Sequence, residues 1–170
     1  MSPRPLKRSL PIVIEPAQAS DLDEIAAIER RSYAFPWTRS VLQAEINGKN
    51  FSHVYVARLA HNSGSAAPKM VGYHYFWLVA DEIHILNMAV DPAYRGCGYG
   101  KQLLRFALDF GQARGATIAL LEVRVSNNAA QQLYKALGFQ RIGLRKQYYA
   151  DDNEDAFVMK KLITNYKNER

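Results

Sequence analysis

The chain has 170 residues, which is enough for one well-buried domain and short for two, so we expect all functional parts to share one core. With 48% hydrophobic and 22% charged residues it is typical of a globular protein, and no apolar run approaches the roughly 20 residues of a membrane-spanning helix. Its net charge of +6 favours an anionic ligand or surface, which leaves a phosphorylated cofactor, RNA and the ribosome open.

A single cysteine, Cys97, excludes an intramolecular disulfide and a cysteine-based metal cluster, and it fits a reducing compartment. The four histidines have no helical metal-binding spacing, so we predict no metal. The basic segment 1–11 lacks the apolar core and cleavage site of a secretory signal. We therefore expect a cytoplasmic protein with a basic tail over 1–11, one domain over 12–162 and a C-terminal tail over 163–170.

Strand-like and helix-like segments alternate along the chain. The strand-like segments are alternating or continuous apolar runs. The helix-like segments have apolar residues three and four positions apart and follow a residue that can cap a helix N-terminus. In chain order we expect a strand at 12–17, a helix from Ser20 or Asp21 to about Arg31, a helix from Thr38 through Ile46, strands at 52–59, 70–79 and 83–90, a helix that ends at Gly115, a strand at 118–123, a helix from Asn127 to Gly138, and strands at 140–149 and 156–162.

The connections between these segments predict a mixed sheet. The small and polar run 61–68 joins two strands as a hairpin, which requires antiparallel pairing. The strand, helix and strand from 83 to 123 form a parallel crossover, and the nearly all-apolar strand 118–123 is typical of one covered on both sides. We expect an α/β fold in a single domain, with a twisted mixed sheet of about seven strands and about four helices packed on both faces.

A glycine-rich loop at 95–101 lies between a predicted strand and the N-terminus of a predicted helix. Free backbone N–H groups and the helix dipole attract an anion there. Gly96, Gly98 and Gly100 permit unusual dihedral angles, so that several N–H groups can converge on one pyrophosphate. A bulky side chain at Gly98 or Gly100 is expected to obstruct it.

Two other glycine motifs fail on the same residues. A Walker loop needs its first glycine where Arg95 stands, and a serine or threonine where Gln102 follows the lysine. A dinucleotide fingerprint that starts at Gly96 needs a small residue at the position of Lys101. The remaining alternative is a turn whose glycines only reverse the chain.

The segment 87–101, with Arg95, Gly98 and Gly100 at its core, resembles the acetyl-CoA motif of the GNAT acetyltransferases. The similarity extends to RimI-type ribosomal-protein-alanine N-acetyltransferases and covers the chain from about Ile12 to Leu162, which implies the GNAT fold. Further matching segments are 34–37, 121–124, 126–130, 133–134, 137–139, 148–149 and 154–156.

This resemblance implies that the backbone of a strand end holds the pantetheine arm of acetyl-CoA and that the glycine loop wraps its pyrophosphate. A cofactor arm beside a splayed strand completes the hydrogen bonds that the neighbouring strand leaves open. Asn127 would contact the arm further along, although capping its own helix is sufficient reason for its presence. The expected cofactor-binding residues are Met88, Ala89, Val90, Arg95, Gly96, Cys97, Gly98, Tyr99, Gly100, Lys101 and Asn127.

Acetyl transfer to an amine needs a base for the amine, a donor for the oxyanion and an acid for the departing thiolate. The resemblance implies Glu122 as the base and Tyr134 as the acid. Glu122 also stands out independently, because a carboxylate in an apolar strand is costly to bury unless it is paired, for instance with Arg124, hydrated or used. Tyr134 by itself is typical of a packing residue. For the oxyanion we expect a backbone N–H at the end of the strand 87–90.

The acceptor amine is expected between two loops on the side opposite the cofactor, where specificity is commonly built. The resemblance implies a protein N-terminus, and specifically the N-terminal alanine of a small-subunit ribosomal protein, with no nucleic acid required and no membrane. The acidic turn 151–155 either attracts such a cationic acceptor or is an ordinary hydrophilic turn. The expected substrate-binding residues are Tyr33, Phe35, Trp37, Tyr148 and Tyr149.

Three other functions stay open at this point. A GNAT enzyme can acetylate a small amine such as a polyamine or an aminoglycoside. A non-catalytic acetyl-CoA-binding module or a basic RNA-associated protein can keep the same fold, since a fold does not determine function. The presence of both Glu122 and Tyr134 argues against the non-catalytic alternatives. A covalent route through Cys97 is not expected, because no histidine is near it in the sequence.

Overall fold

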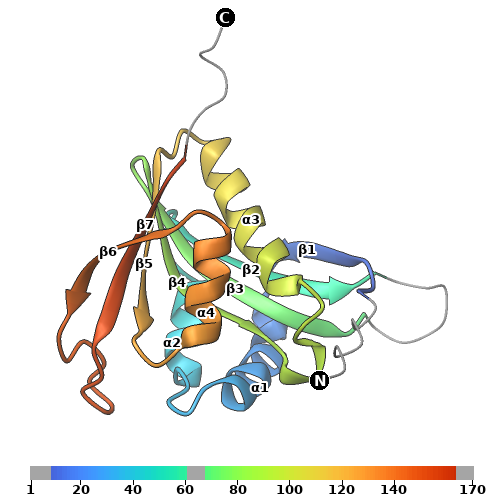
Figure 1. Cartoon of the computed structure of the whole chain (residues 1–170). Helices are drawn as coiled ribbons and strands as arrows, with labels where there is room; N and C mark the ends of the chain where they lie inside the picture. Colours follow the sequence, from blue (N-terminus) through green and yellow to red (C-terminus); the bar gives the residue numbers. More distant parts are fainter. Residues whose placement is uncertain (1–8, 61–67, 164–170) are drawn as a thin grey trace, which may run out of the picture.

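The computed structural model describes residues 9–60 and 68–163, which form one mixed sheet with helices on both faces (Figure 1). The hairpin connection expected at 61–68 and both terminal tails lie almost wholly outside these residues. The elements are β1 Ile12–Pro16, the 3₁₀ turn η1 Ala19–Asp21, α1 Leu22–Ser32, α2 Arg39–Ile46, β2 Ser52–Leu59, β3 Met70–Val79, β4 Glu82–Val90, the 3₁₀ turn η2 Pro92–Tyr94, α3 Tyr99–Gln112, β5 Ile118–Arg124, α4 Asn128–Ala136, β6 Gln140–Arg145 and β7 Ala156–Leu162.

The sheet has seven strands in the order β1-β2-β3-β4-β5-β7-β6. Neighbours pair antiparallel except β4 and β5, which are parallel and are joined by the crossover through α3. The expected α/β fold, with its mixed sheet and single domain, is therefore confirmed.

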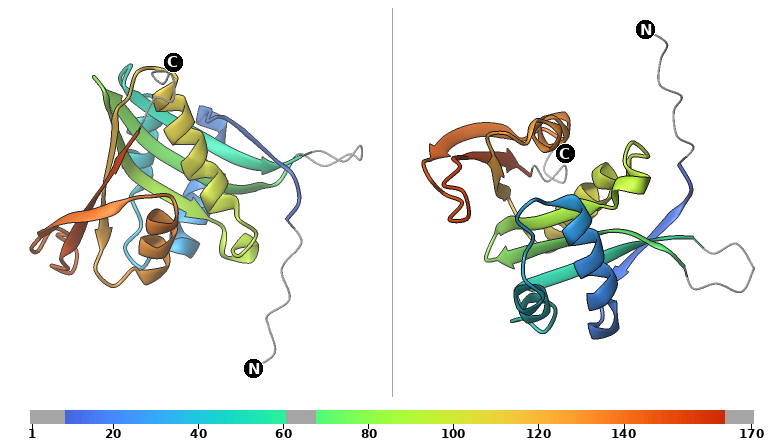
Figure 2. Two further views of the ribbon diagram at one scale, coloured as in Figure 1. Left: turned by 45° about the horizontal axis from the view of Figure 1, so that its top comes forward. Right: turned by 90° about the horizontal axis from the view of Figure 1, so that it is seen from below.

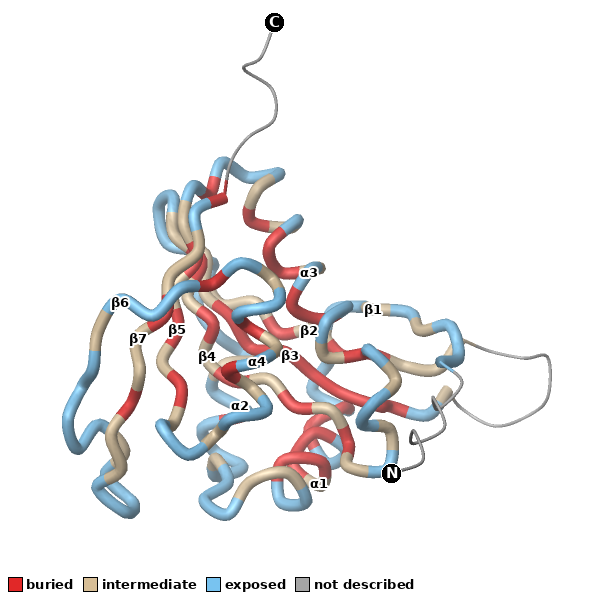
Figure 3. Tube along the Cα trace, in the orientation of Figure 1, coloured by how far each residue is buried: buried red, intermediate tan, exposed pale blue. Residues whose placement is uncertain are grey.

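Helices cover both faces of the sheet, as the view from below shows (Figure 2). Helices α1 and α2 pack on one face through Ile25, Ile28 and Leu42, which are buried against β2 and β3. Helices α3 and α4 pack on the other face, where Leu104 and Tyr134 contribute to the larger core cluster. Buried residues accordingly concentrate along the central strands and the inward sides of α1 and α3 (Figure 3). Each helix is amphipathic because its apolar residues recur every three or four positions.

Strands β4 and β5 are paired at one end only. Their parallel register ends where Ile85 stands opposite Leu121, although both strands continue beyond this pair. A register shift between Tyr75 and Phe76 of β3 falls at the same point and leaves Leu86 of β4 without a partner. Such a bulge bends its strand and disrupts the ladder locally. The two strands therefore separate, and the ends of β4 and β5 border a gap in the sheet.

Strands β1, β4 and β5 differ from the expected bounds by one residue, and two strands differ in a further respect. Strand β6 ends at Arg145 rather than at 149, because Gln147 adopts a positive φ of 51° and its N–H donates to Asp155 Oδ1 at 2.8 Å. Strand β5 is not covered equally on both sides: Ala119, Leu121 and Val123 are buried, while the residues between them are only half-buried. The half-buried face of β5 includes Glu122, so the bend in the sheet exposes the carboxylate to a cavity.

Candidate active site

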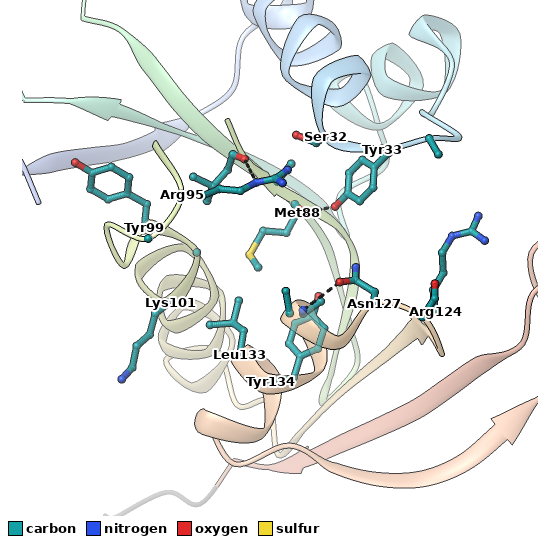
Figure 4. Close-up of a pocket in the computed structure, with 18 of the residues that line it drawn as sticks. Ser32, Tyr33, Met88, Arg95, Tyr99, Lys101, Arg124, Asn127, Leu133 and Tyr134 are labelled. Carbon is teal, nitrogen blue, oxygen red and sulfur yellow. Dashed lines mark hydrogen bonds between the residues drawn. The ribbon is translucent and has the colours of Figure 1, made fainter. Parts of the chain in front are cut away.

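Two adjoining cavities lie where β4 and β5 separate. The larger has a volume of about 730 Å³ and extends over the glycine loop and α4, and the smaller, about 170 Å³, extends over β5 and the segment after α1. The larger cavity is drawn in Figure 4. Six residues line both cavities and mark their junction: Tyr33, Phe35, Met88, Arg124, Asn127 and Tyr134.

The glycine loop forms one end of the larger cavity. Gly96 and Gly98 have φ values of 83° and 80°, and Gly98 is the N-cap of α3, so the unpaired N–H groups of the first helical turn lie at the cavity wall. Arg95 donates from Nε to the carbonyl of Val90 at 3.1 Å, which ties the loop to the end of β4. Lys101 adds a second cation to the lining. This arrangement suits a phosphate-bearing ligand.

The structure brings together ten of the eleven residues expected to bind the cofactor. Cys97 is the exception, because its side chain packs against the core cluster of Val71 and Leu103 and does not line the cavity. Tyr99 lines the cavity, but its buried side chain has another role: its hydroxyl donates to the carbonyl of Leu10 and accepts from the N–H of Leu10, both at 3.0 Å. Any contact of Tyr99 with a ligand therefore involves its backbone.

Asn127 has the capping role that the sequence allows. Its Oδ1 accepts from the N–H of Ala130 at 3.1 Å, at the start of α4, as the dashed line in Figure 4 shows. The side chain nevertheless lines both cavities, and its Nδ2 group has donors that this cap does not use. Helix capping and ligand contact are thus compatible at this position.

The smaller cavity is lined by aromatic side chains from two loops. Tyr33, Phe35 and Trp37 come from the segment between α1 and α2, and Tyr149 comes from the loop between β6 and β7. Tyr33 donates its hydroxyl to the carbonyl of Met88, so it bridges α1 to the free end of β4. Tyr148 lines neither cavity; it packs edge-on against Tyr149 with ring centroids 5.1 Å apart. Four of the five expected substrate-binding residues therefore line one cavity.

Glu122 and Tyr134 both line the smaller cavity, at the end of β5 and on α4. The Glu122 side chain is 27% exposed and its carboxylate lies 3.4 Å from a guanidinium nitrogen of Arg145. Tyr134 is buried, and this burial raises the pKa of its phenol to about 12. Its hydroxyl is therefore protonated throughout the physiological pH range. A carboxylate and a protonated phenol thus line the same cavity.

Arg124, the alternative partner expected for Glu122, binds the acidic turn instead. Its guanidinium donates to both carboxylate oxygens of Asp151 at 2.8 and 2.9 Å, and to Asp152 and Glu154 at 2.9 to 3.0 Å. It also stacks on the ring of Tyr149, 3.9 Å from the ring centroid. The acidic turn expected to attract the acceptor is therefore partly neutralised. Arg124 fixes the β6–β7 loop against the end of β5.

Among the cavity residues that the sequence analysis missed, one is charged. Glu29 lies on the buried face of α1 and lines the smaller cavity. Its position in the sequence could have pointed to it. Glu29 follows Leu22, Ile25 and Ala26 on the apolar side of a helix, where a carboxylate is unusual. The partners that stabilise it come from distant strands, which the helical pattern does not reveal.

Comparison with known proteins identifies the family of this chain. The model of the acetyltransferase (GNAT) family matches residues 22–139, which include α1, the glycine loop, Glu122 and Tyr134. The chain belongs to this family and is an acyltransferase, and the family uses acetyl-CoA. Within 9–60 and 68–163, no helix is long and apolar enough to cross a membrane, and no three His, Cys, Asp or Glu side chains are grouped to hold a metal.

The names of the most similar relatives state a narrower activity than the family description does. The chain is 39% identical over 139 residues to a putative ribosomal protein bS18-alanine N-acetyltransferase of Bacillus subtilis, covering 82% of this chain and 87% of the relative. It is 36% identical to the Escherichia coli bS18-alanine N-acetyltransferase over 148 residues, 86% of this chain and 94% of the other. A crystal structure of the ribosomal-protein-S18-alanine N-acetyltransferase from Escherichia coli superposes with a TM-score of 0.77 and 33% identity over 94% of this chain and 99% of that one.

Proposed function

We propose that this chain is a protein N-α-acetyltransferase, which transfers the acetyl group of acetyl-CoA to the N-terminal alanine of a small-subunit ribosomal protein. The observation that carries the proposal is the junction of two cavities at the separated ends of β4 and β5, with Glu122 and Tyr134 in the lining. The similarity to bS18-alanine N-acetyltransferases supports the choice of acceptor. We also propose a domain over 12–162 and a cytoplasmic location.

The larger cavity has the donors that acetyl-CoA needs. Beyond Ile85, residues 86–90 of β4 have no partner on β5, so their backbone N–H groups on that side can pair with the pantetheine arm, while the carbonyls of Met88 and Val90 already accept from Tyr33 and Arg95. The N-terminus of α3 and the side chains of Arg95 and Lys101 suit the pyrophosphate. The wall at Gly100 is close, since a Cβ added there would lie 3.4 Å from Leu133 and 3.7 Å from Val90. A side chain larger than a methyl group at position 100 would therefore take up part of the space between α3 and α4.

In the proposed reaction Glu122 accepts the proton of the attacking amine. The neutral amine then adds to the thioester carbonyl, and a backbone N–H near the end of β4 stabilises the oxyanion. When the carbon–sulfur bond breaks, Tyr134 donates its proton to the departing thiolate of coenzyme A, and the tyrosinate recovers a proton from the acylated nitrogen, which still carries one in excess. The hydroxyl of Tyr134, whose pKa burial raises to about 12, carries that proton at neutral pH. The products are the acetylated amine and coenzyme A.

The smaller cavity is the proposed acceptor site. Phe35, Trp37 and Tyr149 form an aromatic wall of this cavity. The small volume of the cavity suits the short side chain of an N-terminal alanine and the first peptide bonds. Asp151 of the acidic turn also lines this cavity, which favours a peptide with basic residues further along. A free α-amine projecting into this cavity would meet Glu122.

The function is tested with purified protein, labelled acetyl-CoA and a panel of acceptors analysed by mass spectrometry. We expect one acetyl group on the α-amine of basic peptides that begin with alanine, and none on the same peptides with a blocked N-terminus. Preferential acetylation of a polyamine or an aminoglycoside would establish the small-amine alternative. Binding of acetyl-CoA without transfer to any amine would establish a non-catalytic module.

The glycine loop allows a matched test of the cofactor site. Gly98 and Gly115 both have positive φ, at 80° and 88°, and a Cβ at either would meet no atom within 4 Å, but only Gly98 lines the larger cavity. Valine at either position imposes a strain of about 1–2 kcal/mol. We expect Gly98→Val to raise the KM for acetyl-CoA at least tenfold and Gly115→Val to lower only the melting temperature. Equal KM values in the two variants would argue against a cofactor at this loop.

A further inference from the structure

Glu29 is a buried carboxylate that forms no ion pair with any described residue. It is 1% exposed, and its Oε1 accepts from the backbone N–H of Trp37 at 2.7 Å. Its Oε2 accepts from Nδ2 of Asn87 at 3.0 Å and from the hydroxyl of Tyr73. All three donors are neutral, and no lysine, arginine or histidine of the described ranges forms an ion pair with Glu29. A buried charge of this kind is costly unless a partner compensates it.

The other carboxylates of the smaller cavity have cations beside them. Glu122 lies 3.4 Å from Arg145, and Asp151 is bound by Arg124 at 2.8 Å. Among the described residues that line this cavity, Glu29 is thus the acidic side chain whose charge remains uncompensated. A carboxylate has about four lone-pair positions, and the three neutral donors leave one free.

The charge of Glu29 acts on its surroundings. Burial raises the pKa values of three neighbouring tyrosines, and the charge of Glu29 raises them further. Such an effect is expected of an anion in a region from which water is largely excluded. The titratable groups that surround Glu29 or share its cavity are Tyr33, Tyr73, Tyr75, Glu122, Arg124, Tyr134, Tyr149 and Asp151. A cation that enters this cavity would therefore be stabilised.

We propose that Glu29 is the counter-charge that receives the acceptor amine in its protonated form and positions it before Glu122 removes the proton. The inference rests on the proposed function, because it requires an amine in the smaller cavity. An α-amine has an ordinary pKa of about 7.7–8.0, so it arrives largely as ammonium at neutral pH. Through Trp37, the same carboxylate holds the aromatic wall in place. Glu29 is a positioning residue and takes no proton in the reaction.

This role predicts a specific preference between two ligands. A peptide with a free α-amine is cationic, while the same peptide acetylated at its N-terminus is neutral and is the reaction product. The charge of Glu29 should increase the affinity for the free-amine peptide and leave the affinity for the acetylated peptide unchanged. A purely structural role, in which Glu29 only supports the segment around Trp37, would affect both peptides alike.

The test is calorimetry of both peptides on protein saturated with coenzyme A. Glutamine at position 29 can keep the hydrogen bonds, because the hydroxyl of Tyr73 and the amide of Asn87 can reverse their orientation. We expect Glu29→Gln to weaken binding of the free-amine peptide at least tenfold, as for the loss of a hydrogen bond to a charged group, and that of the acetylated peptide less than twofold. In turnover, the acid limb of the kcat profile should move to lower pH, because the bound ammonium is no longer stabilised.

Glu45→Gln is the matched control. Glu45 also accepts from neutral donors, Ser52 Oγ at 2.6 Å and Trp77 Nε1 at 2.8 Å, but it lies on α2 outside both cavities, so neither peptide should be affected. Equal weakening of both peptides by Glu29→Gln, or no weakening of either, overturns the proposal. Should that variant not fold, Glu29→Asp keeps the charge and must keep the preference for the free amine. Failure of the wild type to acetylate any peptide would reject the proposed function instead.

Discussion

Replacing Glu122 with glutamine is expected to lower kcat at pH 7 by roughly 10²- to 10⁴-fold, the usual contribution of a general base. The loss should shrink above pH 9, because an α-amine with a pKa of about 7.7–8.0 is then already neutral in solution. Steady-state kinetics with an alanine peptide between pH 6 and pH 10 measures both effects. The KM for acetyl-CoA should not change, since Glu122 lines only the smaller cavity.

Glu82→Gln is a suitable control for this experiment. Glu82 is a carboxylate at the opposite end of the β4–β5 pair, where it bonds to His84 and lines neither cavity. It should retain wild-type kcat at every pH. If Glu122→Gln loses the same factor at pH 7 and at pH 10, Glu122 is not the base, and its pairing with Arg145 would be its only evident role.

Replacing Tyr134 with phenylalanine is expected to lower kcat by roughly 10²-fold or more, because the departing thiolate loses its proton donor. With burial raising the pKa of Tyr134 to about 12, the hydroxyl stays protonated from pH 6 to pH 10. The loss should therefore be constant over this range, unlike the loss in the Glu122 variant. Packing should survive, since the ring, 5.8 Å from that of Phe139 between centroids, is retained.

Tyr55→Phe controls for the removal of a hydroxyl. Tyr55 lies on β2 and packs against Phe106 of α3, with ring centroids 4.5 Å apart. It lines neither cavity. It should leave kcat and both KM values unchanged. If Tyr134→Phe keeps wild-type kcat, the thiolate takes its proton from elsewhere. If it mainly raises the KM for acetyl-CoA, the hydroxyl binds the cofactor and is not the acid.

Much of this protein follows from local sequence. Strands β2 and β3 have the bounds that their apolar runs indicate, Thr38 and Asn127 cap the helices that they precede, and the glycine loop begins α3 as expected. These features depend on hydrogen bonds and side-chain periodicity over three or four residues, which a sequence displays directly. The resemblance adds the candidate roles of Glu122 and Tyr134. A family motif identifies such positions without explaining their geometry.

The geometry of the site depends on contacts between distant segments. The bulge at Leu86, which separates β4 from β5, is visible only in the tertiary structure. The same holds for the placement of Arg145 beside Glu122 and for the ion pairs of Arg124 with the acidic turn. Glu29 becomes a candidate because Tyr73 and Asn87, far away in the sequence, meet it inside the sheet. The sequence alone determined most of the elements, the glycine loop and the family. The tertiary structure decided which charges are compensated, since compensation depends on distance in space and not on distance along the chain.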